Sequence, residues 1–380
     1  MTQPAPAPAH PLSGLDLMST PRAKLRERLE AAGERAFRAD QIFVWLHGRG
    51  ARDLGAMTDL PGGLRAALQE HAAPLAALPV VDEQVSEIDG SEKLALQTPY
   101  GAPVETVLMP MQHGVTQCLS SQVGCKMRCD FCATARMAVR ANLTAGEIVE
   151  QVAIACRRGA AAGRVRGGVG GRRGEAGDKL SARPSNLVFM GMGEPLDNLD
   201  ALLDALDILT DDKGYGFSPR RITVSTSGLG KRIPPLAAAQ PDVNIAWSLT
   251  ATTDELRTRL MPVNKAVPID MMVDILANLP QSKSRKLTFE YAIFQDVNDS
   301  PDDADRLGAM ARHLDAHVNI IPFNAWEGSD YERPSRNRVR RFSERTRAQG
   351  ASVSVRESKG RDIDAACGQL ASRERGPTAA

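Results

Sequence analysis

Six short apolar runs alternate with amphipathic stretches between residues 115 and 323. The runs predict strands at 115–119, 186–191, 221–227, 243–249, 286–294 and 318–323. Helical spacing predicts helices at 144–158, 198–209, 229–238, 269–279 and 301–314, and Thr144 with Glu147 forms a capping box at the first. This alternation favours an α/β fold with a parallel sheet, either doubly wound or curved into a partial barrel. In both, functional loops follow the C-terminal ends of strands.

The first 112 residues have a different pattern. Thr20-Pro21 predicts the start of a helix that ends at Gly33, and further helices are expected at about 36–46 and 63–70. We therefore expect a small helical domain over residues 16–75. Strands at 80–88, 93–98 and 104–109, with a turn at Asp89-Gly90, predict a short antiparallel β extension over 76–112.

Three segments have compositions that do not support a packed core. Residues 1–15 begin with alternating Ala and Pro and predict a flexible tail, and 371–380 predict a C-terminal tail. Residues 157–184 hold seven Arg, one Lys, one Glu, one Asp and eight Gly, which predicts a mobile loop. This loop is either a tolerated solvated segment or a contact for RNA. The main α/β domain is expected over 113–370.

Composition adds little about partners. Hydrophobic residues make up 42%, enough for a substantial core, and the formal net charge is only +1. Any nucleic-acid surface must therefore come from local clusters of the 47 Lys and Arg, such as residues 333–347 and the N-terminal helices. We find no signal segment and no apolar run of membrane length, so we expect a cytoplasmic protein without a membrane partner.

Three cysteines are the strongest chemical signal. Cys125, Cys129 and Cys132 have C-x3-C-x2-C spacing shortly after a predicted strand. Three thiolates can ligate three irons of a [4Fe–4S] cluster and leave the fourth iron open to an exchangeable ligand. The alternative is a structural zinc site, for which His113 or Cys118 could supply a fourth ligand.

This spacing resembles the radical S-adenosylmethionine (SAM) signature, and further stretches resemble the RlmN type of dual-specificity 23S rRNA and tRNA adenine-C2 methyltransferases. They are residues 116–125 (TQCLSSQVGC), 191–195 (GMGEP), 224–228 (VSTSG), 321–324 (IPFN) and 362–370 (DIDAACGQL). The resemblance implies a partial (β/α)6 TIM-like barrel with a helical N-terminal domain. It also implies methylation of C2 of adenosine in the peptidyl-transferase region of 23S rRNA and at adenosine 37 of tRNA.

The resemblance also implies the cofactors and the course of the reaction. One [4Fe–4S] cluster per chain would chelate SAM, two SAM would be consumed per turnover, and a flavodoxin or ferredoxin type of protein would donate the electron. Cys367 matches the residue that carries the methyl group as S-methylcysteine. Cys118 matches the resolving cysteine, which forms a transient disulfide with Cys367 and frees the base. Glu105 matches the proton acceptor for C2.

Five further residues match SAM contacts of the family: Gly193, Glu194, Ser225, Ser248 and Asn324. The residues matched to catalysis and to SAM binding also have ordinary explanations. A lone Cys such as Cys118, Cys156 or Cys367 is usually buried in a core, and Glu105 without the resemblance would be interpreted as an exposed strand glutamate. Strand-end Ser and loop Asn residues often bind backbone groups. The chain departs from the family at Thr250, where a His is frequent.

Two rival functions remain. The chloramphenicol–florfenicol resistance (Cfr) type uses the same cysteines to methylate C8 of adenine, and only the product distinguishes it. A non-catalytic RNA-binding protein with a metal site is the rival from another class, but it has no use for Cys118 and Cys367 together with the GMGEP stretch.

Overall fold

The computed structural model describes residues 10–161, 183–280, 282 and 284–371 of the 380-residue chain. They divide into two compact units. The first comprises Met1–Ala77, Thr144–Arg183 and Leu203–Phe217, and the second comprises Leu78–Leu143, Pro184–Leu202 and Ser218–Ala380, each within the described ranges. None of the helices in the described part of the chain has the length and apolar character that a membrane span needs.

The first unit is helical. It holds α1 (Arg22–Ala31), α2 (Phe37–Phe43), a π turn η1 (Val44–Gly48), α3 (Gly62–His71), α4 (Ala145–Ala161) and most of α5 (Leu199–Thr210). Its apolar core includes Leu25, Leu29, Ile42, Leu64 and Leu68. These residues recur at helical spacing, which is why the sequence pattern identifies the helices that carry them.

Two helix starts can be compared with the sequence. The expected capping box is confirmed at α4, because the Thr144 amide donates to Glu147 Oε2 at 2.8 Å and the Glu147 amide to Thr144 Oγ1 at 3.1 Å. Thr20-Pro21 also predicts Thr20 as the N-cap of α1 with Pro21 as the first helical residue, and this assignment is wrong. Pro21 occupies the N-cap position of α1, and the Thr20 hydroxyl donates to the Asp16 carbonyl at 2.5 Å instead.

The segments without a core pattern lie mainly outside the described residues: 1–9, 162–182 and 372–380. At the edges of these gaps the chain is folded. Leu12 and Leu15 are buried in the core of the first unit, and α4 continues through Ala161 into the segment expected to be a loop.

The second unit is built on a ten-stranded sheet with the order β1-β2-β3-β4-β7-β8-β9-β10-β11-β12. The antiparallel part is β1 (Val80–Val85), β2 (Glu92–Gln97) and β3 (Pro103–Met111), which pairs with β4 (Gly114–Cys118). The parallel part runs from β4 through β7 (Asn186–Phe189), β8 (Ile222–Thr226), β9 (Asn244–Ser248), β10 (Leu287–Ile293), β11 (His317–Pro322) and β12 (Ser352–Val355). The predicted mixed α/β fold with a large parallel sheet is confirmed.

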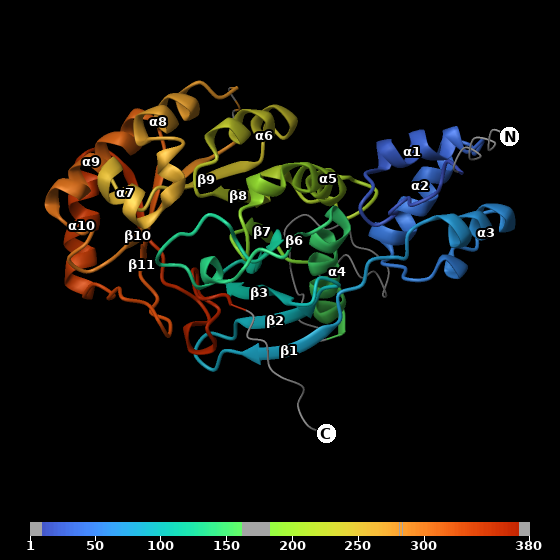
Figure 1. Ribbon diagram of the computed structural model, residues 1–380, viewed down its shortest axis with the longest axis horizontal. Helices are drawn as coiled ribbons and strands as arrows, with labels where there is room; N and C mark the ends of the chain where they lie inside the picture. The colour runs from blue at the N-terminus through green and yellow to red at the C-terminus, as the bar shows by residue number, and fades with distance from the viewer. Residues whose placement is uncertain (1–9, 162–182, 281, 283, 372–380) are drawn as a thin grey trace, which may run out of the picture. The chain divides into compact units, whose positions relative to one another are not determined.

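The strand order excludes one of the two expected architectures. The parallel strands follow one another in chain order across the sheet, whereas a doubly wound sheet reverses direction at a switch point. Strand β12 was not expected from the sequence. Helices α6 (Ile233–Ala239), α8 (Ile269–Ala277), α9 (Pro301–His313) and α10 (Arg336–Ala348) run along one side of the parallel strands (Figure 1). The short helix α7 (Asp254–Leu260) follows β9.

The two faces of this sheet differ in chemistry. Paired residues on neighbouring strands point to the same side, so the register assigns each residue to a face. One face carries the fully buried apolar side chains Leu187, Phe189, Ile222, Trp247, Phe289, Tyr291 and Ile320. The opposite face, called the site face below, carries Lys93, Glu105, Cys118, Ser225, Ser248, Glu290 and Asn319.

Candidate functional site

Most of the sequence-predicted site residues line one cavity in the second unit. Its empty space is about 990 Å³, which includes its open mouth. Nine of the eleven predicted residues line it: Cys125, Cys129, Cys132, Gly193, Glu194, Ser225, Ser248, Asn324 and Cys367. The most distant of them, Cys125 and Cys367, are 242 residues apart in the sequence. The fold gathers them at the C-terminal edge of the parallel strands, where ligands bind in α/β folds.

The three clustered cysteines lie on the loop that follows β4 and β5 (Gln122–Val123). Neighbouring segments hold this loop. The Asp130 amide donates to the Leu260 carbonyl at 2.9 Å, and Trp326 Nε1 donates to the Phe131 carbonyl at 3.0 Å. Cys129 and Phe131 also pack against a buried apolar cluster that includes Phe294 and Phe323. The loop is therefore fixed from two sides and shielded by aromatic side chains.

Burial dominates the electrostatics of these thiols. It raises the pKa of Cys125 to about 12 and raises the pKa values of Cys129 and Cys132 as well. Three such thiols beside one another are costly to ionise unless a cation compensates them. Within the described residues, no three His, Cys, Asp or Glu side chains are gathered as ligands of a single metal ion.

Both residues considered as the fourth ligand of a zinc site lie away from the three clustered cysteines. His113 is exposed and precedes β4, whereas Cys118 is the last residue of that strand. Neither of them lines the cavity that holds the three clustered cysteines.

Gly193 and Glu194 form one wall of the cavity. Gly193 has a φ of +97°, and a Cβ there would lie 2.6 Å from Cβ of Gln122, so the position accepts only glycine. Glu194 is 3% exposed, and its Oε2 accepts from both the amide and the hydroxyl of Ser227 at 2.8 Å. Burial raises the pKa of Glu194, and these donors oppose the rise. A carboxylate held in this way suits an ammonium partner.

The remaining predicted SAM contacts differ in how many hydrogen bonds their side chains already make within the protein. Ser225 and Ser248 face each other, with 3.4 Å between their hydroxyl oxygens. Asn324 is buried, and its amide already bonds Ser358 Oγ at 2.9 Å and Arg333 Nη1 at 3.1 Å. Thr250, which stands where a His was expected, lines the cavity with a φ of +60°.

Cys367 lies on a loop that other segments pin in place. The Ala133 amide of the cysteine-rich loop donates to the Gly368 carbonyl at 2.8 Å, and Thr134 Oγ1 donates to the Leu370 carbonyl at 2.5 Å. Gln369 accepts from the Ala366 amide at 3.1 Å and donates to the Ala325 carbonyl at 2.8 Å. These bonds surround Cys367 and fix its backbone.

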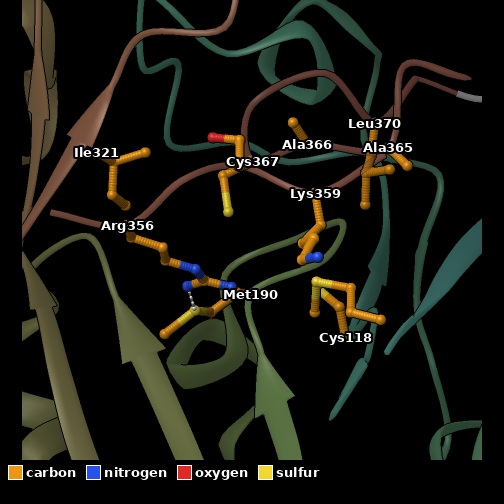
Figure 2. A pocket seen from close by; sticks show the side chains of 11 residues that line it. Cys118, Met190, Ile321, Arg356, Lys359, Ala365, Ala366, Cys367 and Leu370 are labelled. Atoms are coloured by element: carbon orange, nitrogen blue, oxygen red, sulfur yellow. Dashed lines mark hydrogen bonds between the residues drawn. The ribbon is translucent and has the colours of Figure 1, made fainter. Parts of the chain in front are cut away.

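Cys118 lines a second, smaller cavity of about 400 Å³ of empty space, together with Met190, Arg356, Lys359 and Cys367. In Figure 2 the side chains of Cys118, Arg356 and Cys367 point into this cavity from different segments. Burial, with a smaller contribution from Cys367, raises the pKa of Cys118 to about 12, and Arg356 opposes the rise. Cys367 lines both cavities, so it stands where the two meet.

Glu105 lines neither cavity, but it lies on the site face and is 5% exposed. The alternative interpretation of Glu105 as an exposed strand glutamate is therefore wrong. Its Oε1 lies 3.5 Å from Lys93 Nζ, which also donates to the Asp364 carbonyl at 3.3 Å. Its Oε2 is buried and without a partner in the described structure. Burial raises the pKa of Glu105, while Lys93 lowers it.

Sequence reasoning missed four residues that shape the site: Lys93, Arg257, Glu290 and Arg356. Arg257 is fully buried and donates to the carbonyls of Ser227, Ser248 and Leu249 at 2.6, 3.1 and 3.0 Å. It therefore ties together the chain ends that follow β8 and β9. None of the four belongs to a motif, and only strand register could have placed Lys93 and Glu290 on the site face.

Comparisons with known proteins agree with this geometry. Residues 15–73 match the family described as ribosomal RNA large subunit methyltransferase N-terminal domain. The dual-specificity RNA methyltransferase RlmN of Anaeromyxobacter sp. (strain Fw109-5) is 44% identical over 97% of this chain and 94% of its own length. That of Pseudomonas putida (strain W619) is 39% identical over 94% of this chain and 90% of its own length.

A solved structure extends the agreement to the fold. The crystal structure of a radical SAM methyltransferase from Sphaerobacter thermophilus matches with a TM-score of 0.83 and 41% identity, covering 94% of this chain and 100% of that one. Identity above 30% over nearly the full length of these relatives establishes common descent. The chain therefore belongs to the RlmN family of dual-specificity RNA methyltransferases within the radical SAM enzymes.

Proposed function

We propose that this chain is a radical SAM methyltransferase that methylates C2 of adenosine in 23S rRNA and at adenosine 37 of tRNA. The observation that carries the proposal is the position of Cys367, which lines both the cavity of the three clustered cysteines and the cavity of Cys118. A residue that takes a methyl group in one place and is released by a second thiol in another must reach both.

The donor set fits one [4Fe–4S] cluster. Cys125, Cys129 and Cys132 would hold three irons, and each thiolate would bind a different iron, so the ligands need not converge on one point. Glu194 would accept the SAM ammonium group, with Gly193, Ser225, Ser248 and Asn324 around the rest of that molecule. When bound, the cluster and two SAM per turnover would supply the methyl group and the one-electron chemistry, with an electron from a flavodoxin or ferredoxin type of donor.

The chain's own residues perform three tasks in this proposal. Cys367 Sγ carries the methyl carbon and joins it to the base. Glu105 accepts the C2 proton, for which its unpartnered Oε2 is suited. Cys118 then attacks Cys367 Sγ, forms a disulfide and releases the methylated adenine, and a cellular reductant reopens the disulfide.

The finer architecture and setting belong to the same proposal. We assign the helical domain to residues 16–75, the β extension to 76–112 and the catalytic domain to 113–370, with its sheet curved as a partial (β/α)6 barrel and the site face inside. The N-terminal domain would contact RNA in the cytoplasm. The relatives named RlmN favour C2 over the C8 position of the Cfr type.

The decisive experiment is mass spectrometry of nucleosides after reconstituted enzyme has been incubated with SAM, reductant and protein-free rRNA. We expect 2-methyladenosine, whereas 8-methyladenosine would favour the Cfr type and no methylated base would refute the proposal.

Two variants then separate the roles of the cysteines. Cys118→Ala should accumulate RNA covalently attached through Cys367, visible as a shifted band that resists denaturant. Cys367→Ala should form neither adduct nor product, and the double variant should behave like Cys367→Ala. An adduct that survives the loss of Cys367 would show that the carrier is a different residue.

A further inference from the structure

Cys118 faces a chemical difficulty in the cavity it shares with Cys367. Attack on sulfur requires a thiolate, yet Cys118 is 7% exposed in a mostly apolar setting that includes Met109 and Met190. Burial raises the pKa of its thiol to about 12, even though Arg356 already lowers it. Removal of that positive charge would make ionisation of the thiol at neutral pH rarer still.

Arg356 supplies a cation in that cavity. It directly follows β12, and its amide donates to the Ile320 carbonyl at 2.9 Å, which continues the sheet register and puts its side chain on the site face. Its guanidinium projects, next to Met190, into the cavity that Cys118 and Cys367 also line (Figure 2). The position is therefore set by the sheet rather than by a flexible loop.

The charge of Arg356 is left available for a thiolate. Its Nη1 lies 3.6 Å from the thioether sulfur of Met190, which is a weak acceptor. Among the described residues no carboxylate forms a salt bridge with it, and Glu290, the acidic group that influences it, bonds Asn319 instead. Lys359, which lines the same cavity, is the other cation facing Cys118.

We infer that Arg356 is a positioning residue that favours the thiolate form of Cys118 for release of the methylated base. The inference rests on the proposed function. Both cysteines influence Arg356, but once Cys367 carries the methyl carbon its sulfur is a neutral thioether, so Cys118 is the thiol left to pair with the guanidinium.

The assisted step balances as follows in atoms and electrons. The Cys118 thiolate forms a bond to Cys367 Sγ, and the bond from that sulfur to the base-linked carbon breaks. The electron pair of the broken bond stays on the carbon, which takes up a proton and becomes the methyl group. The two sulfurs are oxidised to a disulfide while the carbon is reduced, and a cellular dithiol later reduces the disulfide.

The test follows the covalent adduct of full-length, reconstituted enzyme. Each protein is first incubated with SAM and reductant until mass spectrometry shows complete S-methylation of Cys367, and RNA is then added at a series of pH values. In Arg356→Gln the adduct should persist, decaying about tenfold or more slowly than in the parent at pH 7 and recovering as the pH rises. Arg356→Lys should be intermediate, and Arg361→Gln, an exposed neighbour, should match the parent.

Two results would overturn the inference: decay of the Arg356→Gln adduct at the parental rate, or slow decay that does not recover at high pH. If Arg356→Gln forms no adduct, a second measurement uses the rate at which a small methanethiosulfonate modifies Cys118 as a function of pH. This rate is compared between the Cys367→Ala variant and the Cys367→Ala, Arg356→Gln double variant. The same midpoint pH in both proteins would also overturn the inference. The proposed function fails separately, if the parent makes no 2-methyladenosine or Cys118→Ala makes no adduct.

Discussion

Arg257 offers a sharp test of how the site is held together. The side chain is fully buried, and its guanidinium binds three backbone carbonyls and Asn264 Oδ1, the last at 2.9 Å. Two of those carbonyls belong to Ser227, two residues after the proposed SAM contact Ser225, and to Ser248, which is itself a proposed SAM contact. We expect Arg257→Met to loosen both strand ends at once, since methionine fills part of the space but donates no hydrogen bond.

The expected magnitude follows from the four lost acceptors. A buried acceptor left without its partner costs about 1–3 kcal/mol, so four acceptors at about 2 kcal/mol each would sum to about 8 kcal/mol. The substitution also removes the cost of burying a guanidinium, and neighbouring losses do not add fully. We therefore expect a decrease of about 3–5 kcal/mol in the free energy of unfolding, a large share of the roughly 5–15 kcal/mol typical of a protein.

The assay is urea denaturation followed by tryptophan fluorescence, for which Trp247 is a reporter because its ring lies 5.2 Å from the Arg257 guanidinium carbon. SAM affinity is measured in parallel at low denaturant and should fall. Arg259→Met is the matched control, because Arg259 is exposed on the same helix α7 and should change stability by less than about 0.5 kcal/mol. A stability of Arg257→Met within that margin of the control would refute the reasoning.

Three further predictions concern the metal, the base and the RNA. Anaerobically prepared protein should bind about four irons per chain, and Cys129→Ala should abolish both the cluster and SAM cleavage; stoichiometric zinc without iron uptake would contradict this. Because Lys93 lowers the pKa of Glu105, Lys93→Met should move the acidic limb of the pH–rate profile to higher pH, while Lys93→Arg should leave it nearly unmoved. Arg340→Glu with Arg341→Glu should weaken RNA binding and flatten its salt dependence, and an affinity unchanged at low and high salt would mean that α10 is merely solvated.

The parts of the site that the sequence predicts are those set by local pattern. The cysteine spacing, the glycine-rich turn at Gly193 and the capping box of α4 each lie within a few residues, so the chain itself defines them. Alternation of apolar runs and helices likewise gave the parallel strands β4 to β11, because each strand needs an apolar side to pack beneath helices.

Contacts between distant segments could not be predicted in this way. Lys93 meets Glu105 because Lys93 pairs with Val107 and Ala95 with Glu105, and that register depends on the whole hairpin. Strand β12 is short and largely exposed, so it has only a weak pattern of apolar and polar residues and was not predicted. Arg356, which directly follows this strand, was therefore not recognised as a site residue. From the sequence, Arg257 resembles an ordinary charged helix residue, because its hydrogen bonds to the ends of β8 and β9 depend on the tertiary fold.

The placement of the polar site on a sheet face has a physical explanation. Removing the buried Glu290 and the half-buried Arg356, Ser225 and Ser248 from water costs free energy. Apolar burial on the opposite face of the same strands offsets this cost, since Trp247 and Phe289 are fully buried there and their rings meet edge to face at 5.3 Å. The period-2 geometry of a strand keeps these two sets apart, so substitutions on the apolar face should change stability before they change the chemistry of the site. A variant such as Phe289→Leu, assayed for unfolding and for methylation of RNA below its transition, would separate the two contributions directly.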